Sequence, residues 1–439
     1  MKVLKFGGTS VGSAQRMKEV AKLITDGERK IVVLSAMSGT TNTLVEISDY
    51  LYKKNPEGAN EIINKLESKY RQHIDELFAT PEYKQKGLEL IKSHFDYIRS
   101  YTKDLFTLFE EKVVLAQGEL ISTAMMNYYL QECGVKSVLL PALEYMRTDK
   151  NAEPDPVYIK DKLQVQLELH PDAEIYITQG YICRNAYGEI DNLQRGGSDY
   201  TASLIGAAIN ASEIQIWTDI DGMHNNDPRI VDKTAPVRHL HFEEAAELAY
   251  FGAKILHPTC IQPAKYANIP VRLLNTMEPT APGTLISNDT EKGKIKAVAA
   301  KDNITAIKIK SSRMLLAHGF LRKVFEIFES YQTSIDMICT SEVGVSVSID
   351  NVKHLNEILD DLKKYGTVTV DKDMCIICVV GDLEWENVGF EAKALDAMRD
   401  IPVRMISFGG SNYNISFLIR ECDKKAALQS LSDALFNEE

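Results

Sequence analysis

The sequence predicts an α/β protein with a mainly parallel central sheet covered by helices on both sides, followed by two small α+β modules. Short apolar runs of strand type recur between stretches of helical periodicity in the first two thirds of the chain. Most of these runs are apolar on both faces, which favours buried parallel strands over half-exposed antiparallel strands. Beyond them the pattern changes to two shorter blocks in which the order β-α-β-β-α-β recurs roughly.

Six apolar runs predict the strands of the central sheet. They lie at residues 3–6, 31–35, 137–140, 174–178, 214–218 and 271–274. After the second run, residues 56–111 carry apolar side chains at helical spacing, with Pro81 between the two halves. We therefore expect a helical hairpin inserted after the second strand.

A change in composition predicts a domain boundary. Residues 278–293 are rich in Pro, Gly, Thr, Ser, Asn and Asp, which is typical of a linker or surface loop. The sequence thus predicts two domains, residues 1–295 and residues 296–439, and the second domain allows one module to be inserted in the other. In the second domain, we expect strands at residues 304–309, 334–339, 343–349, 368–370, 374–380, 403–408 and 414–419, and helices at 320–331, 352–365 and 390–399.

Composition excludes several classes of protein. Asp and Glu outnumber Lys and Arg by 62 to 50, a net charge of −12, which disfavours nucleic acid and anionic membranes as partners. No apolar run approaches the ~18 residues of a membrane span, and the first residues lack the features of a signal peptide. Seven cysteines without regular spacing indicate a reducing compartment. We expect a soluble cytoplasmic protein.

A glycine turn follows the first predicted strand. Gly7 and Gly8 let the backbone approach an anion closely, and Thr9, Ser10 or Ser13 can cap the helix after the turn. The amides at a helix N-terminus favour phosphate, and Lys5 adds a full positive charge. These residues predict a phosphate site; the alternative is a simple chain turn beside a solvated lysine.

A second glycine turn, at Gly196 and Gly197, also opens a predicted helix. Arg195 beside it can hold a carboxylate through a bidentate pair, although a surface ion pair is an equally ordinary role. Further polar residues sit at strand ends, where open α/β sheets bind ligands, and each alone is more often structural. They are Ser35, Thr41, Glu119, Thr218, Asp219, Arg229 and Lys254.

Several common motifs are absent from the sequence. It has no P-loop, no Gly-x-Gly-x-x-Gly fingerprint and no protein-kinase set. Cys375 and Cys378 would point to opposite faces of a strand, which favours the core over a metal site. His239 and His241 share a strand face, but no third ligand is evident. We therefore predict no metal held by protein ligands.

Taken in chain order, these motifs resemble those of the aspartate kinase family. The order and spacing match over nearly the whole chain, in residues 5–10, 35–42, 118–119, 195–202, 217–219, 227–229 and 251–258. The resemblance implies an amino-acid-kinase domain followed by two ACT modules. Residues up to Glu439 leave no room for the homoserine dehydrogenase of bifunctional relatives, so we expect a monofunctional member. The resemblance of the C-terminal segments implies the lysine-sensitive type.

The resemblance implies transfer of the ATP γ-phosphoryl group to the side-chain carboxylate of L-aspartate, the first step of lysine, threonine and methionine biosynthesis. Mg²⁺ is expected to bind mainly through the ATP phosphates. His224 departs from the tyrosine that many relatives have there. The implied residues are Lys5, Asp199 and Lys254 for catalysis; Lys5, Gly7, Gly8, Ser10, Thr218, Asp219, His224, Arg229 and Lys254 for ATP; and Ser35, Thr41, Glu119, Arg195 and Ser198 for aspartate.

The C-terminal modules resemble the effector-binding segments of lysine-sensitive members. Asp336 and Glu342 would receive a cationic ligand; the alternative is the ordinary helix start and strand ends of an ACT module. The resemblance implies that lysine binds between modules of paired subunits, and hence a homo-oligomer. The implied effector residues are Met314, Gly319, Phe320, Leu321, Ser334, Ile335, Asp336, Ser341 and Glu342.

Two other functions remain open from the residues alone. One is a related kinase acting on another small carboxylate or carbamate, against which Arg195 and Glu119 favour an α-amino acid. The other is a non-catalytic amino-acid sensor. Such a sensor has no need of the charges of Lys5, Asp199 and Lys254.

Overall fold

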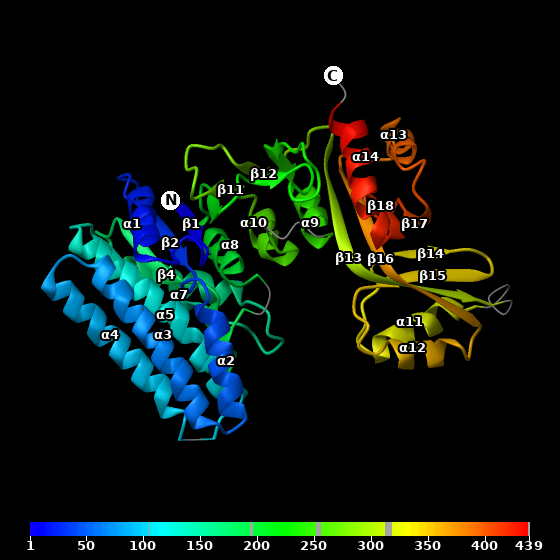
Figure 1. Ribbon diagram of the computed structural model, residues 1–439. Helices are drawn as coiled ribbons and strands as arrows, with labels where there is room; N and C mark the ends of the chain where they lie inside the picture. Colours follow the sequence, from blue (N-terminus) through cyan, green and yellow to red (C-terminus); the bar gives the residue numbers. More distant parts are fainter. Residues whose placement is uncertain (104, 194–195, 252–255, 312–317, 438–439) are drawn as a thin grey trace. The chain divides into compact units, whose positions relative to one another are not determined.

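The computed structural model describes residues 1–103, 105–193, 196–251, 256–311 and 318–437 (Figure 1). Contacts divide the chain into two compact units. The first comprises Met1–Met223 and Leu256–Asn288, and the second comprises His224–Ile255 and Asp289–Glu439. Residues 224–255 thus group with the C-terminal part of the chain, while the division at residue 295 remains a prediction about functional modules.

The first unit contains the predicted parallel sheet. Its strands run in the order β12-β11-β7-β1-β2-β4-β3, and only β12 is antiparallel to its neighbour β11. All residues of β2 and β4 are buried, which explains why apolar residues occupy both faces of these strands. The strands are β1 (Lys2–Phe6), β2 (Lys30–Leu34), β3 (Ser137–Leu140), β4 (Ile175–Gln179), β7 (Ile214–Thr218), β11 (Val271–Asn275) and β12 (Thr284–Ser287).

The predicted helical insertion is present, but it is larger than a hairpin. Helix α2 (Thr40–Tyr52) separates β2 from α3 (Pro56–Leu77) and α4 (Pro81–Ser100), and the last predicted residues belong to α5 (Leu108–Glu132). Both α3 and α4 begin with proline, which suits the first turn of a helix. Figure 1 shows α3, α4 and α5 lying side by side.

Shorter elements complete the first unit. A hairpin of β5 (Ile182–Arg184) and β6 (Ile190–Asn192), which the sequence pattern did not predict, precedes the second glycine turn. The remaining elements are α1 (Ala14–Ile24), α6 (Ala142–Tyr145), α7 (Pro156–Glu168), α8 (Gly197–Ile209), η1 (Pro258–Ile261) and α10 (Gln262–Tyr266), with β8 (Met223–His224) at the boundary.

The second unit is built on an antiparallel sheet with the strand order β14-β15-β13-β16-β18-β17. Its long strands are β13 (Ile295–Lys310) and β16 (Thr367–Gly381). The other elements are β9 (Pro236–Val237), β10 (His239–His241), α9 (Phe242–Tyr250), α11 (Phe320–Ser330), β14 (Ile338–Thr340), β15 (Gly344–Ile349), α12 (Leu355–Leu362), α13 (Phe390–Ala397), β17 (Val403–Ser407), β18 (Asn414–Arg420), η3 (Glu421–Asp423) and α14 (Lys424–Phe436).

Two hydrophobic cores share this sheet, so the predicted α/β fold with two C-terminal α+β modules is confirmed. One core lies under α11 and α12, and the other lies under α13 and α14. Strand β13 passes from one to the other through a register irregularity near Asn303, whose φ is 59°. Three details of the sequence prediction were wrong. Two strands were predicted at 368–370 and 374–380, where β16 is continuous, and the strand predicted at 334–339 begins only at 338, as β14. Helix α14 was not predicted.

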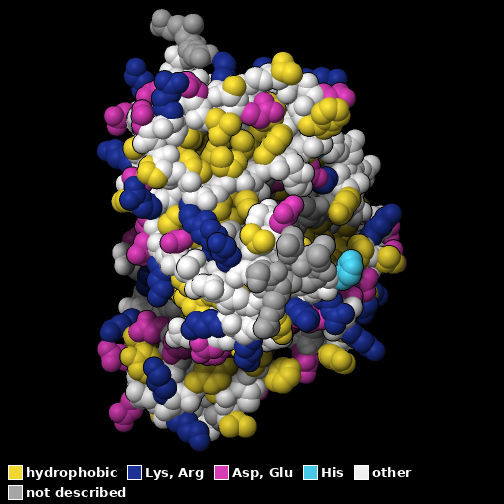
Figure 2. Space-filling model, turned by 90° about the vertical axis from the view of Figure 1, so that its right-hand side faces the viewer, with side chains coloured by type: hydrophobic (Ala, Val, Ile, Leu, Met, Phe, Trp, Pro, Cys, Tyr) yellow, Lys and Arg dark blue, Asp and Glu magenta, His cyan; other side chains and the backbone are white. Residues whose placement is uncertain are grey.

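The surface carries both charged and apolar side chains. Figure 2 shows one face on which hydrophobic side chains gather between clusters of charged ones. Exposed large hydrophobic residues of the second unit include Trp385, Val388, Ile406 and Phe408. Within the described ranges, no helix combines the length and apolarity that a membrane crossing requires.

Candidate active site

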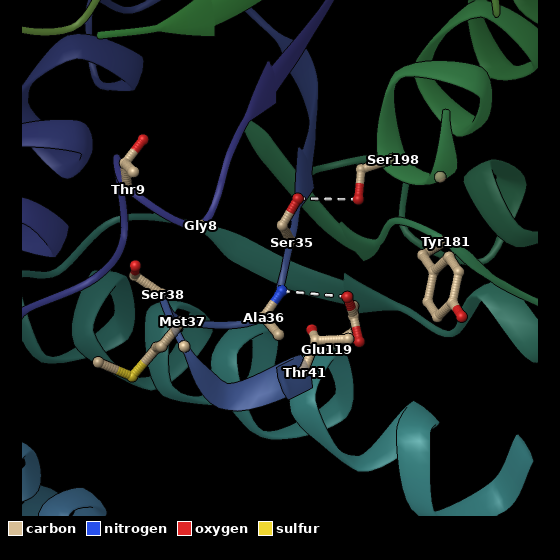
Figure 3. A pocket seen from close by; sticks show the side chains of 12 residues that line it. Gly8, Thr9, Ser35, Ala36, Met37, Ser38, Thr41, Glu119, Tyr181 and Ser198 are labelled. Atoms are coloured by element: carbon tan, nitrogen blue, oxygen red, sulfur yellow. Dashed lines mark hydrogen bonds between the residues drawn. The ribbon is translucent and has the colours of Figure 1, made fainter. Parts of the chain in front are cut away.

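A cavity of about 480 Å³ opens near the carboxyl ends of β1 and β2, where parallel sheets bind ligands (Figure 3). Its walls come from the two glycine turns, the loop after β2 and helix α5. The lining residues are Gly8, Thr9, Ser35, Ala36, Met37, Ser38, Gly39, Thr41, Glu119, Tyr181, Gly197 and Ser198. The fold therefore gathers both predicted glycine turns around one space.

The first glycine turn packs tightly against the loop after β2. The amide of Ser38 donates a hydrogen bond to the carbonyl of Gly8 at 3.1 Å. A Cβ atom on Gly8 would lie 2.9 Å from the carbonyl oxygen of Ala36, so this position requires glycine. Of the three predicted cap residues, Ser13 caps α1, and its hydroxyl oxygen accepts a hydrogen bond from the amide of Arg16 at 3.2 Å.

Lys5 and Asp199 form an ion pair between the two glycine turns. The Nζ atom of Lys5 lies 2.8 Å from Oδ1 of Asp199, and the two side chains are 12% and 15% exposed. Asp199 occupies the first turn of α8, whose N-cap, Gly196, has a φ of 70°. A Cβ atom on Gly196 would lie 1.6 Å from Sγ of Cys260, so the backbone conformation and the packing both require glycine.

Glu119 presents an incompletely paired carboxylate to the cavity. Gly118 lets α5 approach the loop after β2, since a Cβ atom there would lie 2.8 Å from Cβ of Ala36. The Ala36 amide donates to Oε1 of Glu119 at 3.2 Å, whereas the buried Oε2 has no partner among the described residues. Burial raises the pKa of Glu119 to about 7, against the lowering effect of the Ala36 hydrogen bond.

The other predicted aspartate residues surround the same space. The hydroxyl of Ser35 donates to Oγ of Ser198 at 2.8 Å, as Figure 3 shows, and Thr41 also lines the cavity. A Cβ atom on Gly180 would lie 2.3 Å from Oγ of Ser198, which explains a glycine at the end of β4. Thus Ser35, Thr41, Glu119 and Ser198 meet at one cavity. Arg195 lies outside the described residues.

The predicted ATP residues fall into three groups. Gly7, Gly8, Ser10, Thr218 and Asp219 belong to the first unit, His224 and Arg229 belong to the second, and Lys254 lies outside the described residues. The Ser10 hydroxyl donates to Oγ1 of Thr276 at 3.4 Å, and the Thr276 hydroxyl donates to the carbonyl of Thr218 at 2.9 Å.

In the second unit, the two predicted ATP residues already have partners. The His224 ring lies 3.0 Å from the hydroxyl of Thr234, and the Arg229 guanidinium pairs twice with Asp227 at 2.9 and 2.7 Å. The pair with Asp227 keeps the Arg229 side chain beside its own turn, where it remains 76% exposed.

Several cavity residues were missed from the sequence. Thr9, Met37, Ser38 and Gly39 adjoin predicted residues, so their neighbourhood was the available signal. Tyr181 carried no such signal in the sequence. It adopts a φ of 69°, which is uncommon for residues other than glycine. Burial, with the charge of Glu119 as the next cause, raises the pKa of Tyr181 to about 12. Thr276, which bridges Ser10 and Thr218, follows β11 without a distinguishing motif.

Among the predicted effector residues, Asp336 has the most developed environment. Its side chain is 1% exposed, pairs with Nζ of Lys301 at 2.8 Å and accepts a hydrogen bond from the Tyr250 hydroxyl at 2.9 Å. Lys301 also lies 2.8 Å from Asp350. Burial raises the pKa of Asp336, and its Oδ2 atom has no partner among the described residues.

The remaining effector residues lie at helix and strand ends. Gly319 has a φ of 82° and precedes α11, whose first residues are the buried Phe320 and the partly exposed Leu321. The Ser341 amide donates to Gly344 at 2.8 Å. Ser334 and Glu342 are exposed and Ile335 is half-buried, while Met314 lies outside the described residues.

Comparison with known proteins defines the class. Residues 1–275 match the amino acid kinase family, and residues 377–435 match the ACT domain. The chain is 35% identical to aspartokinase 1 of Arabidopsis thaliana chloroplasts, over 99% of this chain and 80% of that relative.

Solved structures agree with the sequence relatives. The fold is similar to that of E. coli aspartokinase III in complex with aspartate and ADP in the R-state, with a TM-score of 0.84 and 31% identity over 99% of this chain and 100% of that one. The structure of the same enzyme in complex with lysine and aspartate in the T-state has a TM-score of 0.82 and 32% identity to this chain, over 99% of each chain. Within the amino acid kinases, the chain belongs to the aspartokinase family.

Proposed function

We propose that this chain transfers the γ-phosphoryl group of ATP to the side-chain carboxylate of L-aspartate, giving 4-phospho-L-aspartate and ADP. The observation that carries the proposal is one cavity lined by the first glycine turn, by the Ser35–Ser198 pair and by Glu119, whose buried Oε2 has no partner among the described residues. Membership of the aspartokinase family supports this substrate, as does the similarity to a structure that holds aspartate and ADP.

The chemistry needs alignment and charge neutralisation more than a base. The aspartate carboxylate is already a nucleophile: its oxygen forms a bond to the γ-phosphorus while the bond from phosphorus to the β,γ-bridging oxygen breaks and ADP leaves. Lys5, oriented by Asp199 at 2.8 Å, would offset the negative charge on the transferring group. Lys254 would stabilise the leaving ADP.

Substrate recognition would use charged and hydroxyl groups around the same cavity. The free Oε2 of Glu119 would accept the α-ammonium of aspartate, because a buried carboxylate without a partner favours a cationic ligand. Arg195 would pair with the α-carboxylate. The hydroxyl groups of Ser35, Thr41 and Ser198 would orient the substrate between these charges.

Mg²⁺ would be held mainly by the ATP phosphates. Within the described ranges, no group of three or more His, Cys, Asp or Glu side chains is placed to hold a metal ion. The phosphate oxygens of ATP are the hard oxygen ligands that Mg²⁺ prefers. When bound, Mg²⁺ supplies charge neutralisation at the β- and γ-phosphates.

We further propose a regulated biosynthetic role in the cytoplasm. The product would enter lysine, threonine and methionine synthesis, and lysine bound between ACT modules of paired subunits would stabilise a less active state. The T-state structure of the E. coli relative with lysine and the unpaired Oδ2 of Asp336 support the effector. The exposed Trp385, Val388 and Phe408 support an oligomer.

Trapping the acyl phosphate with hydroxylamine tests the activity directly. Wild type should form aspartyl hydroxamate with ATP, and lysine should reduce its rate. Lys5→Ala should lower kcat by at least about 100-fold. The matched control is Lys2→Ala, since Lys2 lies on the same strand in an exposed pair with Glu28.

Two outcomes would redirect the proposal. A folded, ATP-binding wild type without product from aspartate, but with product from another small carboxylate or carbamate, would identify a related kinase. Binding of lysine without any phosphoryl transfer would identify a sensor.

A further inference from the structure

Helix α5 carries a charged residue that the proposed mechanism leaves unused. Lys112 lies seven residues before Glu119, two helical turns away and on the same face. Its Nζ atom donates to Oδ1 of Asn192 at 2.8 Å and lies 3.3 Å from Oδ1 of Asp191. The helix that presents Glu119 is therefore tied to the end of strand β6.

Strand β6 leads directly back to the cavity. The hairpin of β5 and β6 starts after Tyr181, and the amide of Leu193, the residue after β6, donates to the carbonyl of Tyr181 at 2.8 Å. The would-be Cβ of Gly197 lies 3.3 Å from the Tyr181 ring. Tyr181 and Gly197, at the base of the hairpin, thus form a second part of the lining of the cavity that Glu119 also lines.

The backbone at the base of the hairpin adopts a conformation that is unfavourable for a residue other than glycine. Tyr181 has a φ of 69°, and its amide donates to Oγ1 of Thr201 at 3.0 Å. The ion pair of Lys112 with Asp191 is partly buried, with the two side chains 18% and 24% exposed, so solvent screens it less than a surface pair. Asn192 is buried, and removing the ammonium would leave its carbonyl oxygen without this donor.

We propose that Lys112, acting on Asp191 and Asn192, is a positioning residue that sets the distance between these two parts of the lining of the aspartate site. The inference rests on the proposed function, because it assumes that the α-ammonium binds Glu119 and the rest of the substrate contacts the second part. A fixed width suits one chain length of amino acid. Loosening it weakens binding of aspartate and reduces discrimination against glutamate, which is longer by one methylene.

The test is Lys112→Met, which keeps most of the apolar stem and removes the ammonium. With the hydroxamate assay, we expect KM for aspartate to rise about tenfold, and kcat and KM for ATP to stay within about twofold. The ratio of kcat/KM for aspartate to that for glutamate should fall. Lys112→Arg should restore KM to within about threefold. Lys65→Met, which removes an exposed pair on α3, is the matched control and should change none of these values.

Asp191→Asn supplies an independent measurement if Lys112→Met does not fold. We expect KM for aspartate to rise about threefold in Asp191→Asn, and the double variant to be no worse than Lys112→Met, because both changes break one interaction. An unchanged KM for aspartate in folded Lys112→Met would overturn the inference. So would parallel losses for aspartate and ATP, which indicate a general structural role. Failure of wild type to phosphorylate aspartate would instead reject the proposed function.

Discussion

The carboxyl group of Glu119 predicts a pH dependence that a single substitution exposes. Glu119 is 3% exposed, one of its oxygens has no partner in the described part of the chain, and burial raises its pKa from 4.5 to about 7. Glu119→Gln keeps the shape and an oxygen acceptor for the Ala36 amide but cannot ionise. The substitution therefore isolates the cost of a buried negative charge.

The magnitude follows from the two pKa values. Because the folded pKa lies above the unfolded one, the folded protein binds the proton more tightly, and stability is lost as the pH rises from 4.5 through 7. At about 1.4 kcal/mol per pKa unit, the full loss is about 3 kcal/mol, of which about 2.5 kcal/mol falls between pH 5 and pH 8. For a domain of this size, this corresponds to about 5 °C in Tm.

Thermal melting of the ligand-free chain at pH 5 and pH 8 measures this effect. We compare the Tm of Glu119→Gln minus the Tm of wild type at the two pH values. This difference should be about 5 °C larger at pH 8 than at pH 5, because only wild type is destabilised as the pH rises. Saturating aspartate should reverse part of the shift in wild type alone, because its ammonium pairs with the ionised carboxylate. The exposed Glu89 on α4 offers the control, and Glu89→Gln should follow wild type at both pH values.

A Tm difference that stays constant within about 1 °C from pH 5 to pH 8 would refute the reasoning. Glu119 would then ionise near its ordinary pKa, and the unpaired oxygen would be solvated. An aspartate-induced shift of equal size in both proteins would separately reject Glu119 as the ammonium-binding group.

Two further substitutions test the packing of each unit. Lys301→Met should destabilise the second unit by about 3–5 kcal/mol in urea unfolding at pH 7, because the buried Asp336 carboxylate would lose its cationic partner and keep only the Tyr250 hydroxyl. This loss should shrink at pH 5, because burial raises the pKa of Asp336 and a protonated carboxyl group needs no cation. Gly196→Ala should lower the free energy of unfolding by about 3 kcal/mol or more in thermal or urea denaturation. Adding Cys260→Ala should remove the steric clash and recover that part of the loss. The ~1 kcal/mol cost of placing alanine in a left-handed backbone conformation should remain. Losses under about 1 kcal/mol in either single variant would contradict these contacts.

Local patterns predicted the central sheet, and the family motifs predicted Gly8, Ser35, Thr41, Glu119 and Ser198 among the residues that line the cavity. Strands such as β2 and β7 are buried in a parallel sheet, so their own residues carry the signal. The glycine turns at Gly8 and Gly196 are also local features, although only the packed structure shows which atoms exclude a side chain there. The same patterns could not show that β13 and β16 run through both C-terminal modules, because that depends on pairing between residues far apart.

What the sequence by itself determined is the chemistry that is available: a lysine before one glycine turn, an aspartate after the other, and a glutamate on an apolar helix. Only the tertiary structure decided how these groups act. The raised pKa of Glu119 comes from burial, and the left-handed backbone of Tyr181 is held by packing. The contact of Lys112 with Asn192 joins residues 80 positions apart. Such properties depend on which groups the fold removes from water and brings together, and no segment carries that information alone.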